Sequence, residues 1–252
     1  MEKIPSLDQQ IEEVASLILA SKYLVVFTGA GISTESGLAD FRGKNGIWTR
    51  RDKGLPPPKS KHFDDVTPNE GHKAIFELQN LGFLKFLISQ NVDNLHLKSG
   101  IKPELIAELH GNYKYMKCIV CDARFKRDEL GWDREIHGRG LRTEEQLVNQ
   151  PICPVCNGRI ISSVVNFNDP MPEKEMKISK EHTNKCDLMI VVGSSLVVQP
   201  AASFPNRAKR NGAKLIIINI DPTPLDNKAD LKVDAKAGEF LIKVVEQIKN
   251  SI

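Results

Sequence analysis

The sequence predicts an α/β fold, a Rossmann-like doubly wound parallel sheet that carries a small inserted module. Two observations predict the sheet. Short apolar runs typical of buried strands alternate with segments of helical periodicity, and a glycine turn follows the first run. A third observation predicts the module, because residues 112–160 hold four of the five cysteines, many charges and few apolar runs. We therefore assign residues 1–111 and 161–252 to the sheet domain and residues 112–160 to the module.

The first half of the sheet domain begins with a helix and a strand. Apolar residues recur at helical spacing over 7–20, and the continuous apolar run 23–27 is typical of a strand buried on both faces. A second helix is expected from Thr67 to about Leu81, with Pro68 at its first position. Two further strands are expected, at 83–89 and 105–109. Residues 43–68 are rich in glycine, proline and lysine, so we predict a loop region there.

The second half of the sheet domain repeats the strand–helix alternation after the module. Strands are expected at 187–192 and 214–219, and helices at 200–211 and 238–248. This alternation favours a parallel sheet covered by helices on both faces.

Polar or glycine residues follow each of five predicted strands. Ligands of doubly wound sheets bind beyond the carboxyl ends of the strands, so these clusters predict one shared site. A single cluster of this kind is more often a plain turn, but five in equivalent places favour a binding edge. The clusters are Gly29, Gln90-Asn91-Val92-Asp93, His110, Gly193-Ser194-Ser195 and Asn219-Ile220-Asp221.

The turn Gly29-Ala30-Gly31 joins the first strand to a helix start, where backbone N–H groups favour a pyrophosphate. It departs from the dinucleotide fingerprint of dehydrogenases. Thr34 stands where a third small residue is expected. The region about 20 residues on, where an acidic residue should end a second strand, holds Arg50, Arg51 and Asp52 in a proline-rich stretch with no predicted strand. The turn therefore favours NAD binding over hydride transfer, and a glycine turn without a ligand remains the alternative.

The two Cys-x₂-Cys pairs predict a zinc site. Each pair can present two thiolates to one tetrahedral ion, and 31 residues separate the inner cysteines. Four protein ligands leave no open position, so one structural Zn²⁺ in a small zinc-ribbon module is expected, with free or redox thiols as the alternative. Cys186 lies outside the pattern and is interpreted as a core residue. The ligands are Cys118, Cys121, Cys153 and Cys156.

Charge and hydropathy constrain the partners and the compartment. A formal net charge of +3 disfavours direct nucleic-acid binding, although basic residues are frequent over 114–142 and leave a local patch open. No apolar run is long enough to span a membrane, and the first 22 residues do not resemble a secretory signal. The expected location is cytoplasmic, with the nucleus open for a eukaryotic source, and the expected state is a monomer or a small homo-oligomer.

Taken together, these motifs resemble the sirtuins, the NAD-dependent protein deacylases, over nearly the whole chain. The order of the motifs carries the resemblance. They are Gly29-Ala30-Gly31-Ile32-Ser33, Asp40-Phe41-Arg42-Gly43, Gln90-Asn91-Val92-Asp93, Leu109-His110-Gly111, the paired cysteines, Gly193-Ser194-Ser195-Leu196 and Asn219-Ile220-Asp221. The segment Gly46-Ile47-Trp48-Thr49 and the cysteine spacing are similar to the branch that includes chromatin-associated mammalian sirtuins. That branch is linked with long-chain deacylation and mono-ADP-ribosylation as well as deacetylation.

The resemblance implies a reaction and a set of site residues. An acyl group would pass from a substrate lysine to ADP-ribose, with release of nicotinamide and O-acyl-ADP-ribose. His110 would be the general base, while Asn91 and Asp93 would bind the nicotinamide carboxamide or order water. The alternative on the same scaffold is a protein mono-ADP-ribosyltransferase. The implied NAD-binding residues are Gly29, Ala30, Gly31, Ser33, Thr34, Asp40, Phe41, Arg42, Trp48, Gln90, Asn91, Asp93, His110, Gly193, Ser194, Ser195, Asn219, Ile220, Asp221 and Ala237, together with the loop region 43–68.

The resemblance also implies acylated-lysine proteins or peptides as partners. The peptide would enter as an extended strand between Val165-Asn166-Phe167 and Val197-Val198. The residues implied in substrate binding are Val165, Asn166, Phe167 and Val197. Two positions depart from the family pattern. Asn94 replaces a glycine, and Asn166-Phe167-Asn168-Asp169 replaces an aromatic residue followed by Gly-Glu, so acyl and peptide preference stay open.

Overall fold

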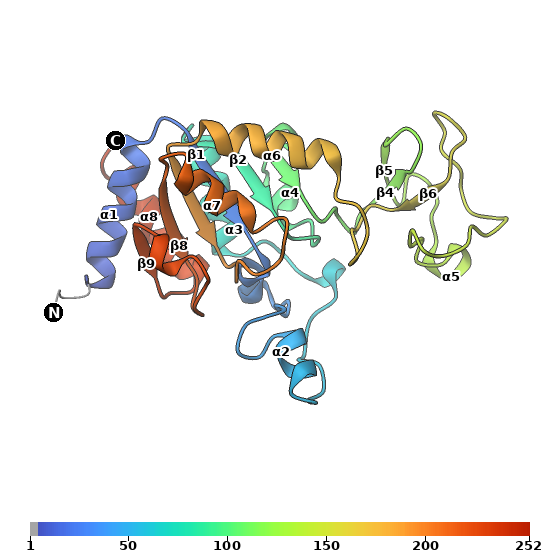
Figure 1. Cartoon of the computed structure of the whole chain (residues 1–252), viewed down its shortest axis with the longest axis horizontal. Helices are drawn as coiled ribbons and strands as arrows, with labels where there is room; N and C mark the ends of the chain where they lie inside the picture. Colours follow the sequence, from blue (N-terminus) through green and yellow to red (C-terminus); the bar gives the residue numbers. More distant parts are fainter. Residues whose placement is uncertain (1–4) are drawn as a thin grey trace.

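The computed structural model describes residues 5–252, so the first four residues of the predicted sheet domain lie outside it. Its body is a six-stranded parallel sheet in the order β3-β2-β1-β7-β8-β9 (Figure 1). The prediction of an α/β fold with a doubly wound parallel sheet is confirmed. The strands are β1 Leu24–Thr28, β2 Leu84–Ser89, β3 Ile106–Glu108, β7 Leu188–Val192, β8 Lys214–Ile218 and β9 Leu231–Val233.

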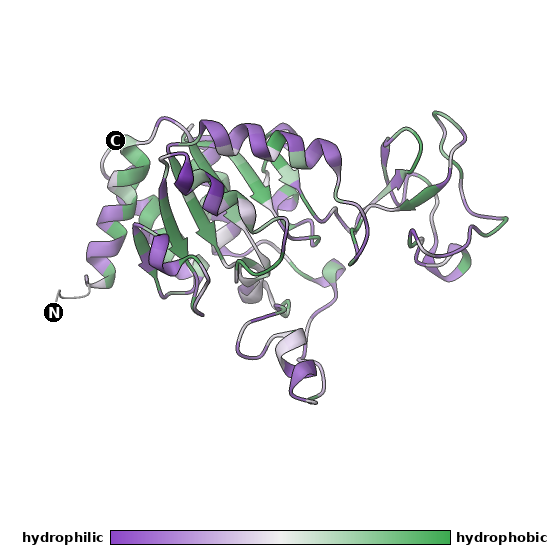
Figure 2. Cartoon of the chain, in the orientation of Figure 1, coloured by the Kyte–Doolittle hydropathy of each residue, from purple (hydrophilic) through white to green (hydrophobic). Residues whose placement is uncertain are grey.

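Helices cover both faces of this sheet. One layer holds α1 (Leu7–Ala20), α3 (Glu70–Asn80) and α8 (Ala237–Lys249), and the other holds α6 (Glu173–Lys185) and α7 (Ser203–Arg210). Successive strand residues point to opposite faces, so Val26 packs under the first layer while Val25 packs under the second. Figure 2 shows the result as apolar strands inside and polar helix surfaces outside. This rigid sheet fixes where its strand ends lie.

The inserted module is a separate three-stranded antiparallel sheet that projects from one side of the body (Figure 1). It contains β4 (Tyr115–Cys118), β5 (Arg124–Lys126), β6 (Ile160–Ser162) and the short helix α5 (Arg134–His137). Because β6 pairs with β4, the second sheet extends two residues past the boundary predicted at residue 160.

Several predicted element ends differ from the structure. The second helix begins at Glu70 rather than at Pro68, because the Asn69 side chain accepts hydrogen bonds from the backbone N–H groups of Gly71 and His72. The predicted loop region 43–68 contains a short helix, α2 (Ile47–Asp52). The helix expected from Pro200 begins at Ser203. Helices α4 (Leu95–Ser99) and α6 and strand β9 were not predicted, because α6 is highly charged and α4 and β9 are very short.

Across residues 5–252, none of the helices combines the length and the apolar character that a bilayer-spanning segment requires.

Candidate functional site

The loops that follow β1 and β7 pack against each other through glycine. The N–H of Gly31 donates a hydrogen bond to the carbonyl oxygen of Gly193 at 2.8 Å. A Cβ atom on Gly31 would lie 2.7 Å from that oxygen, and one on Gly193, whose φ is +60°, would lie 2.3 Å from the nitrogen of Ile32. These glycines are therefore required by the close approach of two strand ends. The turn of the first loop opens a 3₁₀ helix, Ala30–Ser36, rather than an α-helix.

The loops at the carboxyl ends of these strands also carry hydrogen-bond donors suited to a phosphate. Within the described part of the chain, the backbone N–H groups of Ser194 and Ser195 donate to no protein acceptor. The Ser194 hydroxyl accepts a hydrogen bond from the Gln90 side chain at 2.8 Å, which ties the ends of β2 and β7 together. Backbone N–H groups that project from glycine-bearing loops at a sheet edge are a common anion site. The Thr34 hydroxyl, in contrast, donates a hydrogen bond to the Gly31 carbonyl oxygen and so does not point toward this site.

A buried polar cluster lies beside the glycine turn. The Ser33 hydroxyl donates to an Asp93 carboxylate oxygen at 2.6 Å, and the Asn91 side-chain amide donates to the Ser33 oxygen at 3.2 Å. All three residues are buried. Burial raises the pKa of Asp93, against the hydrogen bonds that it accepts from Ser33 and from the N–H of Leu95. The cluster therefore fixes the orientation of the Asn91 amide at the end of β2.

His110 follows β3 with its ring held in one orientation. Its Nδ1 lies 2.9 Å from the Gln90 carbonyl oxygen, which can only accept, so Nδ1 carries the proton in this bond. The Nε2 lone pair of the neutral ring is then available to take a proton. Burial lowers the pKa of His110, opposed by the bond to Gln90, and this keeps the imidazole neutral near pH 7. These features are the ones that a general base requires.

An apolar pocket of about 400 Å³ lies next to the loop region that contains α2. Trp48 lines this pocket, and its ring centroid lies 4.7 Å from that of Phe41 and 5.2 Å from that of Phe167. The Arg42 guanidinium lies 4.6 Å from the Trp48 ring, a cation–π contact. Residues predicted to bind NAD and residues predicted to bind substrate thus meet in one pocket. Its lining residues are Arg42, Trp48, Phe167, Val197, Val198 and Gln199.

The segment predicted to bind the substrate peptide is a turn in this structure. The N–H of Val165 donates to the His110 carbonyl, so the segment is anchored beside the predicted base. Asn166 donates from its backbone and its side chain to the Asp169 carboxylate, and Asn168 has a φ of +69°. Asn94, the other departure from the family pattern, adopts the left-handed conformation with a φ of +65°, which asparagine tolerates.

The remaining predicted residues line the outer part of the edge. Burial raises the pKa of Asp40, and the nearby Asp221 carboxylate adds to the effect although Gly43 donates a hydrogen bond. The Asn219 side chain donates to the Asp221 carbonyl at 2.7 Å, and Ile220 is exposed. Ala237 begins α8 at the next strand end.

Two buried histidines that the sequence analysis did not consider lie beneath the polar cluster. His96 contacts the Thr28 hydroxyl at 3.0 Å, and the ring of His72 lies 4.9 Å from that of His96, with its Nε2 3.5 Å from the Ser33 hydroxyl. Burial lowers the pKa of His72 to about 4 and that of His96 well below its usual value. Each histidine lies on a helix whose sequence mixes polar and apolar residues. The sequence alone therefore does not distinguish these buried histidines from exposed ones. Only the capping pattern Asn69-x-x-His72 offered a signal.

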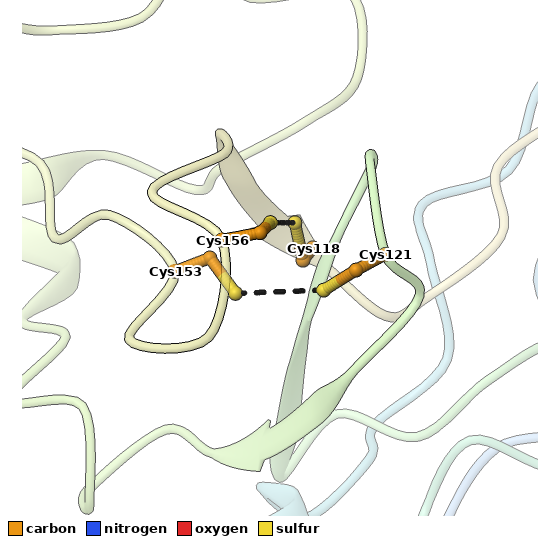
Figure 3. A group of neighbouring side chains, drawn as sticks. All are labelled: Cys118, Cys121, Cys153 and Cys156. Carbon is orange, nitrogen blue, oxygen red and sulfur yellow. Dashed lines mark hydrogen bonds between the residues drawn. The ribbon is translucent and has the colours of Figure 1, made fainter.

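The four module cysteines converge on one point (Figure 3). Their sulfur atoms all lie within 4.8 Å of one another, and the Cys118–Cys156 and Cys121–Cys153 pairs are 3.5 and 3.6 Å apart. Tetrahedral zinc with Zn–S bonds of about 2.3 Å requires sulfur separations of about 3.8 Å. The donor set and its spacing therefore fit a structural Zn²⁺.

Comparisons with known proteins agree with this geometry. A model of the Sir2 family matches residues 29–60 and 57–200. The NAD-dependent protein deacetylase SRT1 of Arabidopsis thaliana is 39% identical over 96% of this chain, and the chain spans 50% of that relative's length. The NAD-dependent protein deacetylase of Rhodopseudomonas palustris is also 39% identical, over 94% of this chain and 96% of its own. A solved structure of Sir2 with a p53 peptide and NAD⁺ is 31% identical, with a TM-score of 0.73 over 94% of this chain and 98% of that chain. The chain belongs to the Sir2 family.

Proposed function

We propose that this chain is an NAD-dependent protein-lysine deacylase that releases nicotinamide and O-acyl-ADP-ribose. One observation carries the proposal: His110 presents a neutral Nε2 at the strand edge where the buried Asn91–Ser33–Asp93 cluster and the glycine loops meet. The activity of the Rhodopseudomonas relative, which the chain matches over nearly its full length, supports the same conclusion. NAD is a co-substrate in this reaction.

The loops after β1, β7 and β8 would hold NAD. The free N–H groups of Ser194 and Ser195 would bind the pyrophosphate beside the Gly29-Ala30-Gly31 turn. Asn219 and Asp221 would bind the adenine ribose. Arg42 and Phe41 would cover the phosphates and the second ribose, and Ser33, Thr34, Asp40, Gln90, Ile220 and Ala237 would line the site around them.

Two residue groups would divide the chemistry. The Asn91 amide, oriented by Ser33 and Asp93, would hold the nicotinamide carboxamide while the bond between nicotinamide and ribose C1′ breaks. The acyl oxygen of the substrate lysine then forms a bond to C1′. His110 Nε2 would next accept the proton of a ribose hydroxyl, whose oxygen attacks the acyl carbon. The bond from that carbon to the lysine nitrogen would then break, and the protonated amine would leave. Water would add to the same carbon, and the bond from that carbon to the oxygen on C1′ would break to give O-acyl-ADP-ribose. The base is thus required only after nicotinamide has left.

The apolar pocket would receive the acyl chain. It is lined by Phe167 and Val197, on the two segments predicted to bind the substrate, and by Arg42 and Trp48 from the region predicted to bind NAD. The peptide would lie along Val165 and Asn166. In this structure the Asn166 backbone N–H donates to the Asp169 carboxylate. On substrate binding, this N–H would donate to the peptide backbone instead.

The module would have a structural role. Its four cysteines would hold Zn²⁺ with no position left for a substrate. We retain the division into a sheet domain at 1–111 and 161–252 and a zinc module at 112–160. We also retain a cytoplasmic location, since five cysteines kept as thiols or zinc ligands are typical of a reducing compartment.

The test combines the chain, NAD and an acetyl-lysine peptide. We expect peptide deacylation that depends on NAD, with equal amounts of nicotinamide and O-acetyl-ADP-ribose measured by mass spectrometry. His110→Ala removes the base and should slow deacylation at least about 100-fold. His137→Ala, in the module, is the matched histidine control and should retain the wild-type rate. Label from NAD that ends on protein instead would assign the mono-ADP-ribosyltransferase activity, and an NAD-independent rate would refute the proposal.

A further inference from the structure

A buried carboxylate next to the predicted base is held by a residue from the zinc module. Glu108 ends β3, two residues before His110, and is only 6% exposed. One of its carboxylate oxygens accepts a hydrogen bond from Arg124 Nη2 at 2.9 Å. Arg124 is the first residue of β5, in the module sheet. This ion pair therefore joins the module to the strand that positions the base.

The other Glu108 oxygen holds the chain on the far side of His110. It accepts a hydrogen bond from the Asn112 side-chain amide at 2.5 Å, and the same amide donates to the Asn94 side chain at 2.8 Å. The Asn112 backbone is fixed in turn, because its N–H donates to the Ser163 hydroxyl at 3.1 Å and its carbonyl accepts from that hydroxyl at 2.7 Å. Glu108 and Asn112 thus bracket His110 in sequence and contact each other in space.

Arg124 is itself fixed by the groups around it. Its guanidinium lies 4.7 Å from the Tyr115 ring, and a second nitrogen lies 3.9 Å from a carboxylate oxygen of Glu175 on α6. Burial raises the pKa of Glu108, while the charge of Arg124 and the hydrogen bonds from Arg124 and Asn112 lower it. The Glu108 charge consequently depends on Arg124, since a buried carboxylate without a partner favours its neutral form.

We propose that Arg124 is a positioning residue, through which the zinc module sets the placement of His110 by way of Glu108 and Asn112. This inference rests on the proposed function, because it assigns His110 the role of base. Without Arg124, the Glu108 carboxylate would either take up a proton or turn toward solvent. In either case its hydrogen bond with Asn112 would change. A shift of about 1 Å in a catalytic group can cost about 100-fold in rate, so a small change suffices.

The two steps of the reaction separate this role from a general loss of structure. Nicotinamide release and its reversal do not use the base, so exchange of labelled nicotinamide into NAD, in the presence of acetyl peptide, reports the first step alone. We expect Arg124→Ala to slow O-acetyl-ADP-ribose formation about tenfold or more while exchange stays within about twofold of wild type. Zinc content and the KM values for NAD and peptide should not change.

Lys126→Ala provides the matched control. Lys126 lies on the same strand and pairs with Glu129 inside the module, so its loss removes a module ion pair without touching Glu108. This variant should match wild type in both steps. Arg124→Lys keeps the charge and should recover part of the acyl-transfer rate. The double variant Arg124→Ala with Glu108→Gln should also be made. The logarithm of its acyl-transfer rate should fall by less than the sum of the falls in the two single variants.

A readout that is independent of activity completes the test. The ring Cε1 proton of His110, assigned by its absence in His110→Ala, should shift in the NMR spectrum of Arg124→Ala and stay unchanged in Lys126→Ala. Equal losses in exchange and acyl transfer, or an unchanged His110 signal, would overturn the positioning role. A wild-type chain that catalyses neither step would instead refute the proposed function, whatever the His110 signal shows.

Discussion

The sheet domain and the zinc module are stabilised in different ways. The sheet domain buries apolar residues on both faces of six strands, in two large clusters beneath two helical layers. The module has one small hydrophobic cluster, and two of its five buried residues are cysteines of the metal site. Large side chains such as Val120, Val148 and Val155 are exposed on it. Apolar burial therefore stabilises the first region, while the second depends on a bound metal.

The two regions meet at the residue that matters most for the proposed chemistry. His110 lies two residues after the end of β3, and the chain enters the module directly after Gly111. Gly111 has a φ of +75°, and a Cβ there would lie 1.9 Å from the Ser163 carbonyl oxygen, so the chain turns sharply at the boundary. Changes in either region can reach His110, but by different routes.

Loss of the metal should have the largest effect. Cys153→Ser removes a buried ligand, and small modules of this kind unfold without their zinc. We expect no stoichiometric zinc by elemental analysis, and rapid hydrogen exchange over residues 114–162. The sheet domain should keep its slow-exchanging strands. Rapid exchange in β1 and β7 as well would show that the two regions are not independently stabilised.

A core substitution reverses that pattern. Ile216 on β8 is fully buried, and Ile216→Ala should lower the free energy of unfolding of the sheet domain by about 2–5 kcal/mol, measured by urea denaturation. Zinc content should not change. Ile160→Ala, at an equally buried position in the module, is the matched variant and should leave the main urea transition in place. A similar loss from both substitutions would contradict the division of labour.

The sequence was sufficient for the sheet and for the metal site because both leave strong local patterns. Continuous apolar runs such as 23–27 are required by strands buried on both faces, and glycine is required where Gly31 and Gly193 pack together. The cysteine pairs need no tertiary information. Among the predicted site residues, His110, Asn91 and Asp93 do lie at neighbouring strand ends, as parallel pairing requires.

Contacts between distant segments were beyond the sequence. Arg124 and Glu108 are 16 residues apart in different sheets, and nothing in their local pattern indicates an ion pair. Seven of the thirteen residues of the helix over 173–185 are exposed, and all seven are polar or charged. Its two buried residues, Ser179 and Thr183, are polar as well, so no apolar stripe marks its buried face. The turn at Asn166–Asp169 depends on a side chain that closes it, not on strand propensity.

The buried histidines should make the sheet domain sensitive to acid. A histidine whose pKa is lowered in the folded state binds more protons when unfolded, so stability is full above pH 6.5 and falls as the pH drops toward 4. For His72 the loss reaches about 3 kcal/mol at pH 4. Urea titrations between pH 7.5 and 4 would measure it, and His72→Gln should flatten the dependence. A curve that His72→Gln leaves unchanged would assign the acid sensitivity to other groups.

The smallest effects should come from two equivalent helix caps, one in each region. Asn69 caps α3 of the sheet domain and Asp133 caps α5 of the module, each accepting hydrogen bonds from two backbone N–H groups. Asn69→Ala should lower the main urea transition by about 1 kcal/mol, because α3 unfolds with the sheet. Asp133→Ala should leave that transition unchanged, since α5 belongs to a region held by zinc, and should only speed hydrogen exchange over 134–137. If Asp133→Ala lowered the main transition as much as Asn69→Ala, the module and the sheet domain would unfold as one cooperative unit.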